Sequence, residues 1–65
     1  MRIETEPEKD GRWLAEVTDL PGVMSYGATR EEAVSKVEAL ALRAIADRLE
    51  HGEIVPDLKK LFAIA

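Results

Sequence analysis

Apolar and polar residues alternate in three short segments near the N-terminus, at residues 1–6, 12–17 and 23–26. A period of two is typical of strands that turn one face toward a core. The segments are separated by residues 10–11 (Asp-Gly) and 19–22 (Asp-Leu-Pro-Gly). Both are turn sequences, because glycine adopts the positive φ angles that tight turns require. Three strands joined by short turns predict an antiparallel meander.

The pattern changes to a helical period after residue 28. Thr29 followed by Glu32 has the spacing of a capping box at a helix N-terminus. Gly52 is suited to end the helix, and Pro56 prevents the helix from resuming. Between these signals, apolar residues recur at spacings of three and four, which predicts one long helix with its apolar face on the sheet: Ala33, Val34, Val37, Leu40, Ala41, Ala44 and Ile45.

The C-terminal segment, residues 58–65, is largely apolar and ends in Leu-Phe-Ala-Ile-Ala. This run predicts a fourth, well-buried strand, with a last short helix as the competing interpretation. The expected fold class is therefore α+β, with a three-stranded antiparallel meander, one long helix packed on the sheet and a C-terminal fourth strand (β-β-β-α-β).

The apolar part of the helix is wider than one sheet can cover. It spans about 200° of the helical circumference, because Leu42 and Leu49 lie to one side of the main face. The apolar residues Leu61, Phe62 and Ile64 would lie on a strand at the edge of a small open sheet. We therefore predict a homo-oligomer, a dimer or tetramer, with these five residues at its interface.

Composition narrows the classes of function. The 65 residues allow a single domain over residues 1–65, with no separate DNA-binding segment. There is no cysteine and only one histidine, His51, so the chain lacks the residues for thiolate or multi-histidine metal sites, and we predict no cofactor. The net charge of −4 and the absence of a basic stripe argue against direct nucleic-acid binding and favour a basic partner.

The sequence also carries signals of location and origin. No apolar run is long enough to span a membrane, and the N-terminal residues lack the apolar region of a signal peptide. We therefore predict a cytoplasmic protein. Asn and Gln are absent and charged residues make up 34% of the chain, a composition typical of thermophiles.

Few residues are candidates for catalysis. His51 has the chemistry of a general base, but its place near the helix end favours a role at the helix C-terminus, since no serine or cysteine nucleophile accompanies it. Glu4, Glu6 and Glu16 lie on strands, where a two-metal nuclease would hold its carboxylates. Their alternation places them on the solvent side, however, so we predict no catalytic and no metal-binding residue.

The aromatic residues with polar atoms have structural interpretations. Trp13 is expected in the core against the helix, and Tyr26 is expected at the rim of the sheet rather than in a ligand-stacking site.

Four phrases occur in a characteristic order. They are Lys-Asp-Gly-Arg-Trp-Leu-Ala-Glu-Val at 9–17, Asp-Leu-Pro-Gly-Val at 19–23, Tyr-Gly-Ala-Thr-Arg-Glu-Glu-Ala at 26–33 and His-Gly-Glu-Ile-Val-Pro at 51–56. Together with the strand and helix order, they resemble the HicB-like antitoxin domain over nearly the whole chain.

The resemblance implies a partial ribonuclease-H-like fold that lacks the catalytic carboxylates of true nucleases. It also implies that the chain binds and blocks a small basic ribonuclease, a HicA-type toxin. The acidic residues Glu4, Glu6 and Glu16 are then the candidate partner-binding residues. Two alternatives stay open, an oligomeric ligand-binding or scaffold domain without a toxin partner, and a metal-dependent nuclease.

Overall fold

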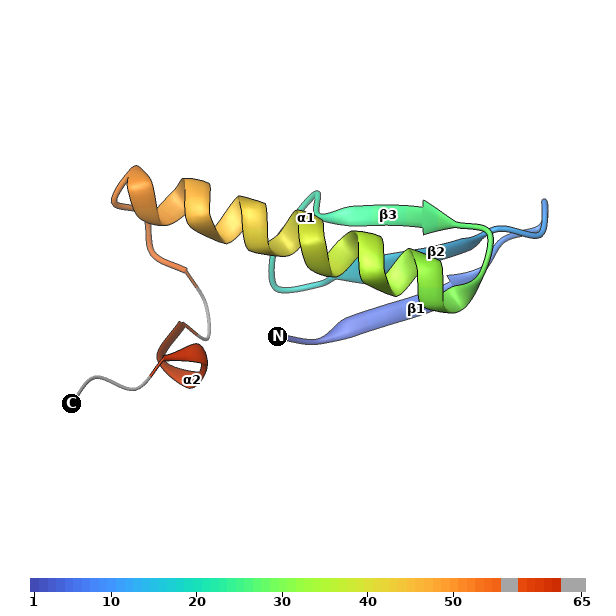
Figure 1. The fold of residues 1–65 in the computed structure, drawn as a ribbon, viewed down its shortest axis with the longest axis horizontal. Coiled ribbons are helices and arrows are strands. Elements are labelled where there is room, and N and C mark those ends of the chain that lie inside the picture. Colours follow the sequence, from blue (N-terminus) through green and yellow to red (C-terminus); the bar gives the residue numbers. More distant parts are fainter. Residues whose placement is uncertain (56–57, 63–65) are drawn as a thin grey trace.

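The computed structural model describes residues 1–55 and 58–62. Its three strands form one antiparallel sheet in the order β1-β2-β3, and the long helix α1 packs on one face of that sheet (Figure 1). The chain is therefore a small α+β domain, as predicted. The elements in chain order are β1 (Ile3–Pro7), β2 (Trp13–Val17), β3 (Met24–Gly27), α1 (Arg30–Glu50) and α2 (Leu58–Leu61).

Both predicted turns are formed, and each has a glycine at positive φ. In the first turn the N–H of Gly11 donates to the carbonyl of Glu8 (3.1 Å), and Gly11 has a φ of 91°. In the second turn the N–H of Val23 donates to the carbonyl of Leu20 (3.0 Å), and Gly22 has a φ of 85°. This hydrogen bond encloses Pro21 and Gly22 as the two central residues of the turn. A proline followed by a glycine at these positions is typical of a type II turn.

Helix α1 begins and ends at the predicted residues. The Thr29 hydroxyl accepts a hydrogen bond from the N–H of Glu32 (3.1 Å), which satisfies one of the free donors of the first turn. At the other end Gly52 has a φ of 72°, and the N–H of Glu53 donates to the carbonyl of Arg48 (2.9 Å). This hydrogen bond is typical of a Schellman motif, in which a left-handed glycine ends the helix.

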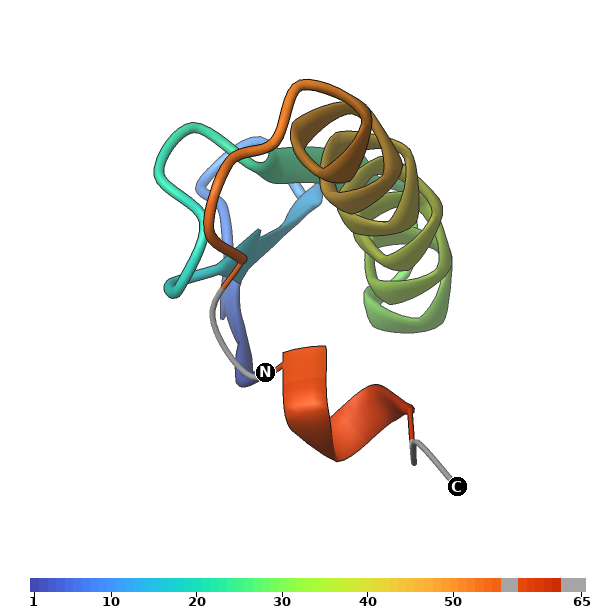
Figure 2. The same ribbon diagram turned by 90° about the vertical axis from the view of Figure 1, so that its left-hand side faces the viewer.

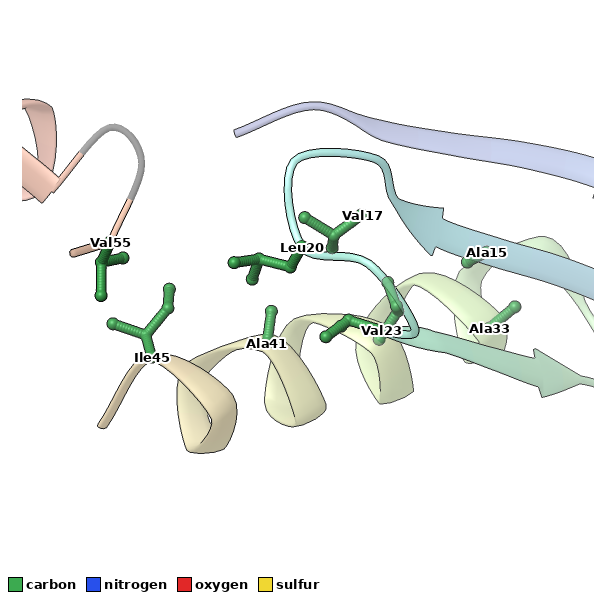
Figure 3. Close-up of a cluster of buried hydrophobic side chains, with 9 residues drawn as sticks. Ala15, Val17, Leu20, Val23, Ala33, Ala41, Ile45 and Val55 are labelled. Atoms are coloured by element: carbon green, nitrogen blue, oxygen red, sulfur yellow. The ribbon is translucent and has the colours of Figure 1, made fainter. Parts of the chain in front are cut away.

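The core lies between α1 and the inner face of the sheet, and its side chains are mostly small (Figure 3). Leu20 is fully buried, although the sequence suggested only a turn position for it. The type II turn directs this side chain toward α1, where it extends the core beyond the end of the strands. The buried residues are Ala15, Val17, Leu20, Val23, Ala33, Val37, Ala41, Ile45 and Val55.

The end of β3 approaches the first turns of α1 closely at Gly27. A Cβ atom added to Gly27 would lie 2.9 Å from the Cα atom of Ala33, closer than real Cβ contacts occur. Gly27 therefore lets the strand and the helix meet backbone to backbone. The connection between them is short, because β3 ends at Gly27 and α1 begins at Arg30.

The prediction of a fourth strand is wrong for residues 58–61, which form the short helix α2 instead. The sequence Leu-Lys-Lys-Leu places its apolar residues three apart, a helical spacing, and two adjacent lysines interrupt the alternation of a strand. The N–H of Phe62 donates to the carbonyl of Leu58 (3.3 Å), and Leu58 packs against the core. Within the described residues, the sheet therefore has three strands.

Among the described residues, no helix combines the length and the apolar character needed to cross a membrane.

Candidate protein-binding face

One face of the sheet is not covered by α1. Figure 2 shows the helix on a single side of the strands. On the other side, the alternation of each strand presents a set of side chains that we call the open face. Its members are Glu4 and Glu6 of β1, Leu14 and Glu16 of β2, and Met24 and Tyr26 of β3.

The strand register arranges the open face in two rows. Glu4 is directly opposite Glu16, which is itself opposite Met24. In the second row, Glu6 is opposite Leu14, and Leu14 is opposite Tyr26. Directly opposed residues have Cβ atoms about 5 Å apart, so Glu4 and Glu16 form a pair of like charges. The face is thus acidic along β1 and apolar along β3.

The acidic part of the face has little compensating charge. The Arg2 guanidinium lies 3.7 Å from the Glu4 carboxylate, but both side chains are largely exposed, and such pairs contribute little to stability. Neither Glu6 nor Glu16 forms an ion pair with a lysine or arginine whose side chain the structure describes. Like charges directly opposed on a sheet are destabilising, so this region favours the approach of a cation.

The same region is hollowed. A shallow, open depression of about 450 Å³ is lined by Arg2, Ile3, Glu4, Thr5, Glu6, Leu14 and Glu16. Because it is open to solvent rather than enclosed, the depression suits a protruding side chain of another protein better than an enclosed small molecule.

The edge of the open face carries an aromatic residue and an arginine. The Arg12 guanidinium lies 4.3 Å from the centre of the Tyr26 ring, within the range of a cation–π interaction. The Asp10 carboxylate holds it there, with 2.7 Å between Asp10 Oδ2 and Arg12 Nε. The Arg12 backbone N–H and then its side chain, both hydrogen-bonded to the Asp10 carboxylate, lower the pKa of that group. Tyrosine and arginine are the residue types that most often dominate binding energy at protein interfaces.

His51 and Trp13 lie where the sequence placed them. His51 Nδ1 is 2.7 Å from the Asp47 carbonyl oxygen and 3.5 Å from its carboxylate, so the imidazole lies at the C-terminus of α1. Trp13 is half-buried and packs against the core. Neither side chain belongs to the open face.

The acidic residues do not form a metal-binding group in the part of the chain that the structure describes. There, no three or more His, Asp or Glu side chains are placed to hold a metal ion. A two-metal nuclease needs such a group of carboxylates.

Of the residues predicted for an oligomer interface, Leu42 and Leu49 lie on α1 and not on the open face. Leu42 and Leu49 are on α1 with 64% and 44% of their surface exposed, and Phe62 follows α2 with 66% exposed. Leu61 belongs to α2, whereas Ile64 lies outside the described residues.

Sequence reasoning identified the three glutamates but missed other members of this surface. Leu14, Met24 and the Arg12–Tyr26 stack were not assigned to binding. The alternation of β2 and β3 places Leu14 and Met24 on the solvent side. Their neighbours across the strands depend on the register, which the turn geometry determines.

No protein-family model, curated protein or solved structure matches this chain.

Proposed function

We propose that this chain is a protein-binding module that sequesters a small basic ribonuclease, as HicB-like antitoxins do with HicA-type toxins. The observation that carries the proposal is the opposed pair Glu4 and Glu16 on a sheet face that no helix covers. A lysine or arginine of the partner, placed between these carboxylates, would remove their mutual repulsion on binding.

Further support comes from the structural roles of the sequence phrases that resemble the HicB-like domain. The Leu-Pro-Gly phrase forms the type II turn that buries Leu20, and Gly27 permits the close approach of β3 to α1. Thr29 caps that helix. These phrases thus have structural tasks in a β-β-β-α arrangement, which favours a HicB-like domain of partial ribonuclease-H type.

The open face combines two kinds of contact that a protein interface uses. Its carboxylates attract a basic partner over a distance and raise the association rate. Met24 and Tyr26, with 41% and 42% of their surface exposed, supply apolar area that is removed from water on contact. In this proposal the glutamates steer the partner, while Tyr26 and its neighbours slow its dissociation.

The proposal is tested by calorimetric titration of the chain with a small basic ribonuclease of the HicA type. We expect binding by the wild-type chain and at least about tenfold weaker binding by Glu16→Lys, which is about 1.4 kcal/mol. The matched control is Glu53→Lys, an equal charge change at an exposed residue beyond α1. Equal weakening by both variants would show that net charge rather than the open face determines binding.

An RNA-cleavage assay separates this proposal from the nuclease alternative. The purified chain is first incubated with RNA and magnesium, and we expect no cleavage. In a second assay the chain is added to the ribonuclease and its RNA substrate, and we expect the chain to inhibit cleavage. Magnesium-dependent cleavage that Glu16→Gln abolishes would contradict the proposal. Absence of binding to any such ribonuclease would instead favour the scaffold alternative.

A further inference from the structure

A second uncharged stripe runs along α1, separate from the stripe that faces the core. Its members are all exposed and follow one another at spacings of four and three, the pattern of a coiled-coil seam. None of them is charged, although α1 carries charged residues on both sides of the stripe. We call this stripe the seam, and it consists of Ser35, Ala39, Leu42, Ala46 and Leu49.

The seam borders an apolar groove between α1 and the start of β1. Met1, Ile3 and Val17 form one wall of the groove, and Glu38, Ala41, Leu42 and Ile45 form the other, around a volume of about 210 Å³. Leu42 belongs to both the groove and the seam. The apolar surface is therefore continuous from the seam, across the flank of α1, to the N-terminal strand.

No strand of the sheet lies beside the C-terminal half of α1 (Figure 1). α1 has 21 residues and is about 31 Å long, whereas strands of four or five residues reach only about 17 Å. The C-terminal half of α1 consequently extends beyond the sheet (Figure 1). Leu42 has 64% of its surface exposed because it lies on a part of α1 that turns away from the core, whereas Leu20, also a leucine, is fully buried.

We propose that the seam binds the seam of a second copy of this chain, with the two α1 helices antiparallel about a two-fold axis at Leu42. The sequence supports this axis because the seam is nearly symmetric about Leu42. In the antiparallel pair, Leu42 meets its own equivalent, Ala39 faces Ala46, and Ser35 faces Leu49. Small residues opposite one another allow close approach, and the leucines fill the space between them.

The flanks of α1 favour the antiparallel arrangement. A two-fold axis that makes the helices antiparallel brings equivalent flanks together, whereas a parallel pair brings opposite flanks together. In the antiparallel pair, the groove of one copy adjoins the groove of the other, so apolar surface meets apolar surface. A parallel pair would instead place the groove against the charged flank, which carries Lys36, Arg43, Asp47 and Glu50.

Part of the other flank of α1 is complementary in charge in the antiparallel pair. Pairing about Leu42 brings Lys36 of one copy near Asp47 and Glu50 of the other. Arg43 lies next to the axis and therefore approaches its own equivalent, so the favourable charge contacts of this flank are those of Lys36. The helix dipoles also align favourably when the helices are antiparallel.

Sedimentation equilibrium tests the dimer. We expect the wild-type chain to have twice its 7.2 kDa mass at micromolar concentration, and Leu42→Lys to sediment as a folded monomer with an unchanged helical circular dichroism spectrum. The matched control is Met24→Lys, the same change on the open face, which should remain dimeric. A monomeric wild type, a dimeric Leu42→Lys, or dissociation caused by Met24→Lys would each overturn the proposal.

Disulfide cross-linking tests the orientation without requiring the dimer to dissociate, because the chain has no natural cysteine. Leu42→Cys should cross-link readily on oxidation, since the two positions meet at the axis. Ala39→Cys should not, because its equivalents are about 9 Å apart along the helix axis, beyond the Cα separation of about 7 Å that a disulfide spans. Efficient cross-linking of Ala39→Cys would indicate parallel helices and contradict the antiparallel dimer.

Discussion

Glu4 and Glu16 are directly opposite each other on β1 and β2, on the face of the sheet that α1 leaves uncovered. Like charges in this position lower the stability of a sheet. Residues that lower the stability of a fold are typical of functional surfaces, where the residue type serves binding rather than folding. The opposed carboxylates are therefore the centre of the proposed partner-binding face.

The first prediction follows from this pair. Glu16→Lys should raise the free energy of unfolding by about 0.5 kcal/mol, because it replaces a cross-strand repulsion by an attraction. Urea unfolding measures the change, and Glu53→Lys, which has no opposed strand residue, is the control. If Glu16→Lys is more stable and also binds the partner more weakly, Glu16 serves binding at the expense of stability. A less stable Glu16→Lys would contradict this interpretation.

The contact between β3 and α1 gives a second prediction. Gly27→Ala should cost about 2 kcal/mol of unfolding free energy, because its Cβ would overlap the backbone of Ala33. Gly22→Ala is the comparison, since the space around Gly22 is open and only its φ of 85° opposes a side chain. We expect the thermal midpoint to fall further for Gly27→Ala. If Gly27→Ala lost less unfolding free energy than Gly22→Ala, α1 would be able to move away from β3 and make room for the added methyl group.

Leu20 provides a third prediction. Leu20→Ala should lower the unfolding free energy by about 2–5 kcal/mol, because it removes the largest fully buried side chain of a small core. Ile54→Ala is the control, since 94% of the Ile54 surface is exposed and its truncation should change stability by less than about 0.5 kcal/mol. Chemical unfolding of both variants measures the difference, and similar losses would mean that the second turn does not pack as described.

The strands, turns and helix limits followed from the sequence because local interactions determine them. Gly11, Gly22 and Gly52 have the positive φ that the turns and the helix end require, and Thr29 caps the helix. The burial of Ala33, Val37, Ala41 and Ile45 likewise agrees with the periodicity of the helix.

Other features depend on contacts between distant parts of the chain. The burial of Leu20 results from how its turn folds against α1, and nothing in residues 19–22 alone distinguishes a buried leucine from an exposed one. The opposition of Glu4 and Glu16 depends on the strand register. The helix at Leu58–Leu61 was only the competing interpretation of the sequence, because a short apolar run fits a buried strand as well as a helix and its two leucines alone carry the helical spacing.

A fourth prediction concerns acid. The Lys36 ammonium, 2.9 Å from the Glu32 carboxylate, lowers the pKa of Glu32, and hydrogen bonds from Arg12 lower the pKa of Asp10. Both groups therefore add stability at neutral pH, and this stability is lost as the pH falls below their ordinary pKa values, about 4.3 for a glutamate and about 3.9 for an aspartate. Urea unfolding at several pH values should show the decline.

The control for the acid prediction is the double variant Asp10→Asn and Glu32→Gln. Because the amides do not titrate, the stability of this variant should fall less steeply with acid than that of the wild type. An identical pH dependence in both proteins would show that other carboxylates account for the decline.

Stopped-flow mixing with the small basic ribonuclease proposed as the partner, over a range of salt concentrations, measures association and dissociation separately and so tests whether the open face attracts that partner. Salt shortens the Debye length from about 10 Å at 0.1 M to about 3 Å at 1 M, so association steered by the open face should slow markedly. Dissociation should change much less, since contacts around Tyr26 that exclude water determine it. We therefore expect salt to slow association strongly and to leave the dissociation rate nearly unchanged. Association that is independent of salt, or no binding below about 10 μM, would contradict it.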